Sequence, residues 1–199
     1  MHNRMRVLAG LVLIVLPRPL LGQGHWGITG EVGAAQFSGH AHSVSGLETT
    51  GHPAAASTWG IRLDHGTGRA RLSVGLLYST TGVEFESDDL VAGVKNLLTL
   101  LEISPELSWQ ALHAGACSVR FHGGMVIDRW SPDGDPARTA LGGLAALSLE
   151  APLSHRANIA VRWEATLTQS VFDDNDLPAD FERKQGFRRR LGIGIRFSL

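Results

Sequence analysis

Residues 187–199, which read FRRRLGIGIRFSL, decide the fold more directly than any other stretch of the chain. From Leu191 to Leu199, apolar residues alternate with Gly, Arg and Ser. Because successive side chains of a β-strand point to opposite faces, this pattern predicts a strand with one apolar and one polar face. A C-terminal strand with its apolar face outward is suited to closing a transmembrane β-barrel.

Seven further segments alternate in the same way. Their lengths, near ten residues, suit strands that cross the hydrocarbon layer at a tilt. Bacterial outer-membrane barrels have an even number of strands, and eight is the smallest usual size. The sequence therefore predicts an all-β, eight-stranded antiparallel up-and-down transmembrane β-barrel. The predicted strands are residues 26–37, 58–65, 69–79, 97–109, 117–130, 141–151, 158–170 and 187–199.

The connections between these strands sort into two kinds. Segments 38–57, 80–96, 131–140 and 171–186 are long, polar and rich in Gly, Pro and Asp, whereas 65–68, 110–116 and 152–157 are short. Outer-membrane barrels have long loops outside the cell and tight turns in the periplasm. With a periplasmic start, every long loop falls outside.

Aromatic residues stand near the ends of the predicted strands, where amphipathic rings favour the membrane interfaces. We expect two girdles: Trp26, Trp109 and Phe197 at the periplasmic rim, and Phe37, Trp59, Tyr78, Trp130 and Phe187 at the outer rim.

The first 24 residues read as a secretory signal peptide. Arg4 and Arg6 precede an apolar run, 7–16, that is too short to span a bilayer as a helix, and small residues follow at Gly22 and Gly24. Residues 25–199 then form the barrel domain. The one cysteine, Cys117, has no partner for a disulfide within the chain, and we expect it to be a small packing residue.

The predicted inward face is strongly charged. Buried charges are stable only when they are paired and hydrogen-bonded, and side chains fill the narrow lumen of an eight-stranded barrel. We therefore predict an Arg–carboxylate ladder, with His122 as a further partner, that plugs the barrel and pins strand register. The acids are Glu31, Asp64, Glu102, Glu106, Asp128, Glu150 and Glu164; the arginines are Arg62, Arg71, Arg120, Arg162, Arg188, Arg190 and Arg196.

Two stretches, SVGLLYSTTGVEFE (73–86) and LLTLLEISPELSW (97–109), carry a family resemblance. They resemble the third strand, loop and fourth strand of bacterial outer-membrane β-barrel domain proteins, the porin-family and OmpA/OmpX-like small barrels. LGIGIRFSL resembles their last strand, so the resemblance extends over nearly all of the mature chain. It implies the fold, an outer-membrane location and recognition of residues 191–199 by the barrel-assembly machinery, but no single activity.

Two positions depart from the family pattern. Ser104 displaces the family proline to Pro105, which favours a β-bulge there. The chain ends in Leu199, where many such proteins end in an aromatic residue, and Phe197 is the nearest substitute.

Residues that could carry chemistry are few. His40, His42 and His52 in the first long loop do not form a convincing metal site. Acids at 84–89 and 173–180 lack the EF-hand spacing and read as solvated rims. We predict neither a metal nor a cofactor. Basic residues near the outer end of the last strand could bind lipopolysaccharide phosphates: Arg183, Lys184, Arg188, Arg189 and Arg190.

No convincing nucleophile and base stand together in the sequence. His122 is expected beside Asp128 and Glu102 as an ion-pair partner rather than a proton-transfer group, and His65 is the one outward candidate for lipid chemistry. The formal net charge of −1 gives no basis for nucleic-acid binding.

The sequence thus favours a monomeric outer-membrane barrel, not an enzyme, with a structural, adhesive or surface-binding role among outer-membrane lipids and lipopolysaccharide. Two alternatives stay open. One is a lipid-modifying outer-membrane enzyme. The other is a soluble periplasmic β-barrel or sandwich that binds a small ligand.

Overall fold

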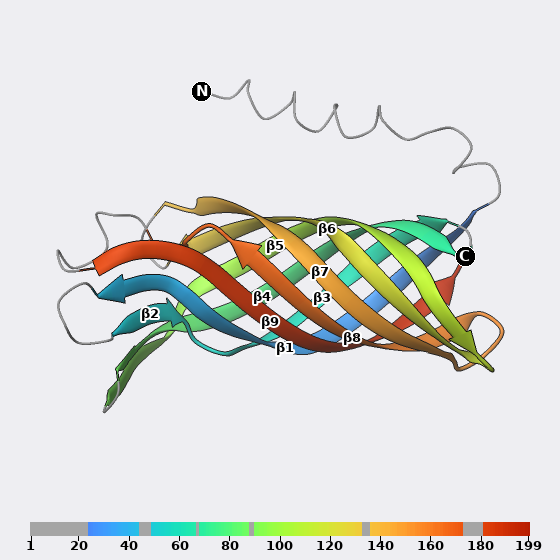
Figure 1. Cartoon of the computed structure of the whole chain (residues 1–199), viewed down its shortest axis with the longest axis horizontal. Coiled ribbons are helices and arrows are strands. Elements are labelled where there is room, and N and C mark those ends of the chain that lie inside the picture. Colours follow the sequence, from blue (N-terminus) through green and yellow to red (C-terminus); the bar gives the residue numbers. More distant parts are fainter. Residues whose placement is uncertain (1–23, 44–48, 67, 88–89, 133–135, 173–180) are drawn as a thin grey trace, which may run out of the picture.

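The computed structural model describes residues 24–43, 49–66, 68–87, 90–132, 136–172 and 181–199 (Figure 1). The predicted signal peptide, except for Gly24, lies outside these residues. Within the described ranges no helix is long and apolar enough to cross a membrane. The strands are β1 (His25–Ser43), β2 (Thr50–Pro53), β3 (Ala56–Gly66), β4 (Ala70–Ser87), β5 (Leu90–Ala114), β6 (Cys117–Pro132), β7 (Arg138–Pro152), β8 (Ala157–Thr168) and β9 (Phe181–Ser198).

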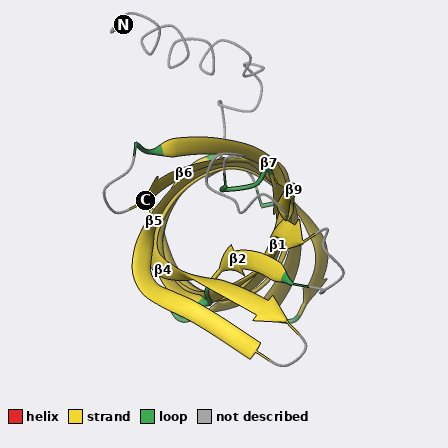
Figure 2. Ribbon diagram, turned by 90° about the vertical axis from the view of Figure 1, so that its left-hand side faces the viewer, coloured by secondary structure: helices red, strands yellow, loops and turns green. Residues whose placement is uncertain are grey.

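The strands close into a barrel. β1, β3 and each later strand pair antiparallel with the next one, and β9 returns to pair with β1 from Gly27–Ser198 to Ser43–Phe181. Figure 2 looks along the barrel and shows the closed ring. Closure leaves no unpaired sheet edge through the body of the barrel. The predicted eight-stranded antiparallel up-and-down fold is confirmed.

The two ends of the barrel differ as the connections predict. The turns after β3, β5 and β7 are short, and Gly115 supplies the left-handed conformation (φ 60°) that the β5–β6 turn requires. We call this the turn end, and the opposite end the loop end. The C-terminus lies at the turn end (Figure 1).

At the loop end the strands run further than predicted. β4 and β5 extend through most of predicted loop 80–96 as a hairpin that projects beyond the barrel (Figure 1). β2, inside predicted loop 38–57, pairs with β1 and with β4. Backbone pairing holds a hairpin together in any solvent, whereas the alternation that marks a strand in sequence needs two different environments on its two faces.

The apolar face of the last strand points outward. Leu191, Ile193 and Ile195 are 57%, 52% and 42% exposed, whereas Gly192 and Gly194 between them are buried. Large apolar side chains are exposed in the same way on all eight strands of the ring. The predicted orientation is confirmed.

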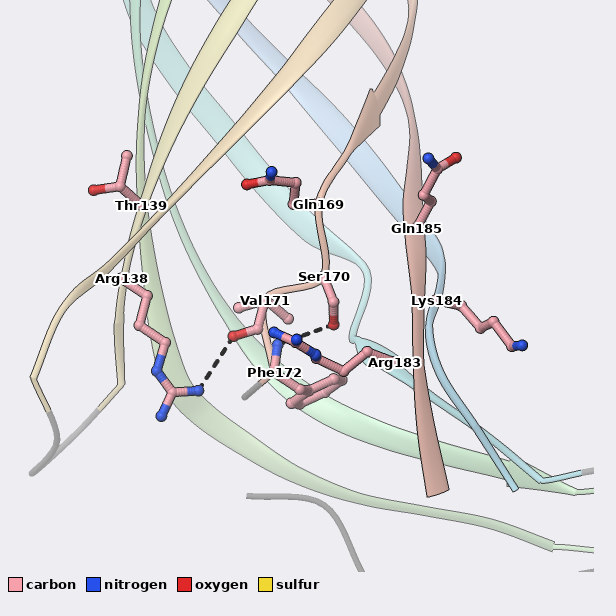
Figure 3. Close-up of a pocket in the computed structure, with 9 residues that line it drawn as sticks. All are labelled: Arg138, Thr139, Gln169, Ser170, Val171, Phe172, Arg183, Lys184 and Gln185. Atoms are coloured by element: carbon pink, nitrogen blue, oxygen red, sulfur yellow. Dashed lines mark hydrogen bonds between the residues drawn. The ribbon is translucent and has the colours of Figure 1, made fainter. Parts of the chain in front are cut away.

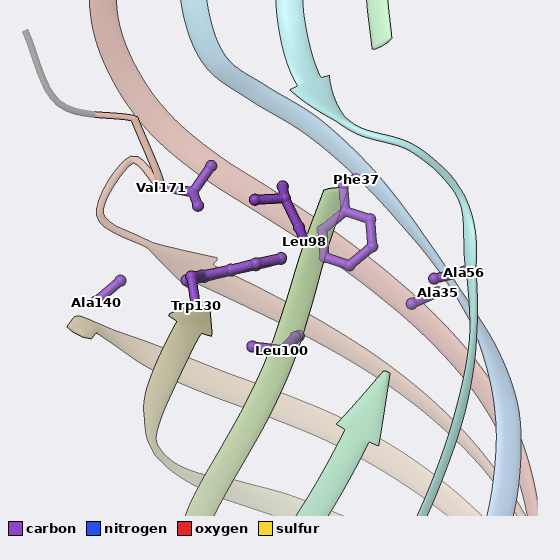
Figure 4. Close-up of a cluster of buried hydrophobic side chains, with 8 residues drawn as sticks. All are labelled: Ala35, Phe37, Ala56, Leu98, Leu100, Trp130, Ala140 and Val171. Carbon is purple, nitrogen blue, oxygen red and sulfur yellow. The ribbon is translucent and has the colours of Figure 1, made fainter. Parts of the chain in front are cut away.

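Two members of the predicted outer girdle are not on the outside. Phe37 and Trp130 are buried inside the loop end, where their rings pack edge to face with centroids 5.7 Å apart (Figure 4). They belong to a group we call the apolar cluster: Ala35, Phe37, Ala56, Leu98, Leu100, Trp130, Ala140 and Val171. The girdle prediction was wrong for these two residues because a position at a strand end does not tell whether a side chain faces outward or into the lumen.

Two smaller predictions are also wrong. The register between β5 and β6 is the same on both sides of Pro105, and the shift falls between Gln110 and Leu112 instead. A missing N–H interrupts the ladder without adding a residue. Cys117 is exposed at the β5–β6 turn and does not pack.

Candidate functional site: the charged lumen

The inward positions of the strands fill the lumen with charge. Every acid and arginine of the predicted ladder has an ion-pair partner in the structure, and most of these side chains are buried. They form layers that run from the turn end toward the loop end. Because each side chain comes from a fixed strand position, the layers also tie distant strands together.

The middle layer is a closed circuit of three glutamates and three arginines, which we call the ion-pair ring. Its members are Glu31 of β1, Arg62 of β3, Glu106 of β5, Arg162 and Glu164 of β8, and Arg190 of β9. Going round, Glu31 meets Arg62 at 3.1 Å, Arg62 meets Glu106, and Glu106 meets Arg162 at 2.8 Å.

The circuit closes through Glu164, which accepts from Arg162 and from Arg190 at 2.9 Å each, while Arg190 returns to Glu31 at 3.2 Å. Every member thus has two neighbours of opposite charge. Such alternation is the arrangement in which buried charges offset one another's desolvation. The ring joins strands on different sides of the barrel and so crosses the lumen.

Towards the turn end the pairs are separate. Two nitrogens of Arg196 on β9 donate hydrogen bonds to the carboxylate of Asp64, at 2.7 and 3.0 Å. Arg71 meets Glu150 at 2.9 Å. Arg120 lies 4.0 Å from the same glutamate and donates to the backbone carbonyls of residues 68 and 69.

Towards the loop end one arginine serves two acids. The guanidinium of Arg188 contacts Glu102 and lies 3.2 Å from Asp128. Arg188 therefore binds one acid from β5 and one from β6. This layer lies next to the apolar cluster, on its turn-end side.

His122 has other partners than the sequence led us to expect. Its Nε2 lies 2.8 Å from the hydroxyl of Ser148, and its Nδ1 lies 3.4 Å from Glu106. Asp128 and Glu102 are bound to Arg188 instead. The order of serine, histidine and carboxylate is that of a hydrolase triad, but Ser148 is buried inside the lumen and Glu106 is also held by two arginines.

The predicted phosphate-binding cations divide into two groups. Arg188 and Arg190 are buried in the lumen, on the face where the charged ladder placed them, so they are not exposed to lipopolysaccharide phosphates. Arg183, Lys184 and Arg189 are exposed. Arg189 points outward and lies over the ring of Phe187, 5.9 Å from its centroid.

Other candidates are only partly described. His52 lies 3.6 Å from Glu86 of β4 at the loop end. The acids at 88–89 and 173–180 and the side chain of His40 lie outside the described residues. His65 contacts Trp26 at the turn end, with the two rings tilted by 54° and their centroids 4.6 Å apart.

No family model matches the chain, and no curated protein matches it. Solved structures do. Neisserial surface protein A matches with a TM-score of 0.57 and 11% identity, over 87% of this chain and 97% of that one. The outer membrane protein OprG from Pseudomonas aeruginosa matches with a TM-score of 0.56 and 12% identity, over 88% and 97%. The chain therefore has the fold of the bacterial eight-stranded outer-membrane β-barrels.

Proposed function

We propose that this protein is a small integral barrel of the bacterial outer membrane, with a closed lumen and a structural or surface-binding role. The observation that carries the proposal is the combination of an apolar outer face on all eight strands of the ring with a charged lumen in which every acid and arginine of the ladder has an ion-pair partner. We infer that a barrel built this way is stable in hydrocarbon and that its filled lumen offers no open path for a solute.

The outer band supports insertion into lipid. Soluble monomers seldom expose a contiguous apolar patch larger than a few hundred Å². Here Val32, Leu76, Leu147 and Ile193 stand for exposed apolar side chains on strands all round the barrel. A soluble ligand-binding barrel would need these residues inside, where arginines and glutamates lie instead.

The ion-pair ring supports a closed lumen. Beside its Arg190, between that layer and the apolar cluster, lies a cavity of about 10 Å³, lined in part by Thr58, Ser79 and Arg188. That volume is about one water molecule. Moving a solute past these layers would require breaking several buried ion pairs, each of which is costly to leave uncompensated.

The loop end is the part available for surface contacts. The β4–β5 hairpin projects there, beyond the rest of the barrel (Figure 1). At the other end, residues 191–199 of β9 alternate between apolar and polar side chains. We infer that the barrel-assembly machinery recognises this pattern. We propose that the protein acts as a monomer among outer-membrane lipids and lipopolysaccharide, without nucleic-acid partners.

A lipid-modifying enzyme is the less favoured function. Ser148, His122 and Glu106 have the order of a triad, but Ser148 faces the lumen and is 3% exposed. A lipid substrate would reach a nucleophile on the outer face. An unchanged lipid A mass spectrum with and without the gene is the expected result.

Two measurements test the proposal. Purified protein should migrate faster on a detergent gel before boiling than after it, as a closed barrel does, and should give no conductance steps in a planar bilayer. A missing shift together with release from membranes by salt would support a soluble protein. Regular conductance steps would contradict the closed lumen.

A further inference from the structure

The described residues line a hollow at each end of the barrel, and the charges of the two hollows are used differently. At the loop end the hollow lies between the ends of β7, β8 and β9 (Figure 3). There Arg138 and Arg183 turn toward residues 170–172, and Arg138 donates to the carbonyl of Val171 at 3.4 Å. These arginines are engaged with the chain itself, so the loop-end hollow does not indicate a ligand site.

The hollow at the turn end is the mouth of the lumen, and we call it the turn-end vestibule. Its volume is about 460 Å³, and side chains of β4, β5, β6, β7 and β8 line it together with the β3–β4 turn. That volume is in the range of small-molecule pockets. The ion-pair ring closes the lumen further in, so the vestibule is blind and suits binding rather than passage.

The charges of the lumen are not balanced on this side of the ion-pair ring. Here two acids, Asp64 and Glu150, meet three arginines, Arg71, Arg120 and Arg196. Arg196 pairs with Asp64 and Arg71 pairs with Glu150, whereas Arg120 lies 4.0 Å from Glu150 and has no closer carboxylate among the described side chains. The turn side of the lumen therefore carries an excess positive charge.

Arg120 is held next to the vestibule. It is fully buried, and its guanidinium donates to the backbone carbonyls of Gly68 and Arg69 at 2.8 and 3.2 Å. Both of these residues line the vestibule. The hydrogen bonds fix the β3–β4 turn at the mouth, and the charge of Arg120 adds to the positive potential there.

The rim of the vestibule adds a further cation. Arg69 is exposed there. The short turns 65–68, 110–116 and 152–157 contain no Asp or Glu that could neutralise it. Glu150, the acid among the described lining residues, is already paired with Arg71 at 2.9 Å. An anion is therefore the class of ligand that the charge of the vestibule favours.

The remaining lining is polar and uncharged. Gln110, Ser118 and Asn158 each offer a hydrogen-bond donor and an acceptor. Together with the volume, this lining suits a solute with hydroxyl or amide groups beside its anionic group.

We propose that the turn-end vestibule binds a small polar organic anion, a phosphate ester or a carboxylate. Arg69 and the remaining N–H donors of Arg71 contact the anionic group, since a guanidinium carries five donors in a fork that matches both oxyanions. The inference goes beyond the proposed function, and the binding itself does not need the membrane location. In the orientation expected for an outer-membrane barrel, the ligand is a periplasmic solute.

The test uses the mature chain in detergent micelles, with glucose 1-phosphate as the probe in calorimetric titrations free of other phosphates and carboxylates. Arg69→Gln should weaken binding by about tenfold, because a charge-assisted contact is lost. Ser118→Glu, which adds a carboxylate to the lining, should weaken it as well. Arg156→Gln is the matched control: this arginine is exposed in the turn after β7 and does not line the vestibule, so binding should equal that of the wild type.

Further arms identify the recognised group. Glucose, which lacks the phosphate, should not bind, and equal binding of glucose would overturn the assignment to an anion. Succinate tests the carboxylate: binding that depends on Arg69 extends the site to carboxylates, whereas binding of glucose 1-phosphate alone restricts it to phosphate esters. If neither anion binds, or if Arg69→Gln and Arg156→Gln bind equally well while showing the heat shift, the inference fails and the proposed function stands. A wild type without a heat shift would contradict the proposed function and leave the titration result valid.

Discussion

The barrel interior is built in opposite ways at two levels. Around the ion-pair ring the inside is charged and the outside is apolar. At the loop end the inside is the apolar cluster and the outside is polar. β6 shows the change within four residues: Ile127 is outward and Asp128 inward, then Arg129 is outward and Trp130 inward. The backbone alternation is continuous, and only the chemistry of the two faces is exchanged.

The exchange shows that the surroundings, not the fold, decide which face is apolar. Where hydrocarbon surrounds the wall, apolar side chains face out and the charges must pair with one another inside. Where water surrounds it, burial of apolar surface inside again stabilises the structure, as in a soluble barrel. With the proposed membrane location, we infer that the boundary between the two levels lies at the membrane surface on the side of the loop end.

The largest effect is expected inside the ion-pair ring. Glu106→Gln keeps the size of the side chain but leaves Arg62 and Arg162 without their shared carboxylate. We expect a loss of about 4 to 5 kcal/mol in the free energy of unfolding, near the upper end for a broken buried pair, because two arginines are affected. Urea unfolding in lipid vesicles measures it.

The matched control is Glu182→Gln, which removes an exposed carboxylate paired only with Lys184 in the described contacts. Its unfolding midpoint should not move measurably. Equal losses for the two variants would mean that the ring contributes no more than a surface pair does.

The next effect tests the other level. Trp130→Ala removes the largest side chain of the apolar cluster and should cost about 3 to 4 kcal/mol, as large-to-small changes in packed cores do. Trp59→Ala removes an outward ring that is 59% exposed, and lipid fills the space it leaves. The same unfolding assay should show a smaller loss in the free energy of unfolding for Trp59→Ala than for Trp130→Ala. A larger loss for Trp59→Ala would contradict the burial of Trp130 in a packed apolar cluster.

A smaller effect is expected on the outer face. Ile193→Arg puts a charge in the apolar band and should destabilise the barrel by about 2 to 3 kcal/mol in vesicles. Gln36→Arg, exposed beyond the band at the loop end of β1, should cost at most about 1 kcal/mol. If both positions tolerate arginine equally, neither lies in hydrocarbon.

Most of the membrane-level structure could be predicted from the sequence because lipid and lumen impose a strict period of two. That period placed Leu191 outward, Arg196 inward and every member of the ion-pair ring on the correct face. It did not give the circuit of the ring, since strand register and tilt decide which acid meets which arginine. His122 shows this limit, because the prediction put its side chain in the lumen correctly but named Asp128 and Glu102 as its partners instead of Ser148 and Glu106.

The loop end was harder for a physical reason. The girdle was predicted from the position of aromatic residues at strand ends, and that position does not tell whether a ring faces outward, as at Trp59, or inward, as at Trp130 and Phe37. The end of the β8–β9 pairing at Thr168–Gly186 could not be predicted either, because strand register and the path of the chain after β8 decide where the pairing stops. One signal was available: Arg129 and Arg189 fall on the outward face, where arginine indicates the end of the apolar band.

The native tryptophans allow the most direct test of the exchange between the two levels. In variants that keep a single tryptophan, Trp163 should be strongly quenched by lipids brominated on their acyl chains, because it faces outward within the apolar band and is 48% exposed. Trp130, buried inside the loop end, should keep its fluorescence in the same vesicles. Equal quenching of the two, or quenching of Trp130 alone, would contradict a barrel that is apolar outside in the membrane and apolar inside above it.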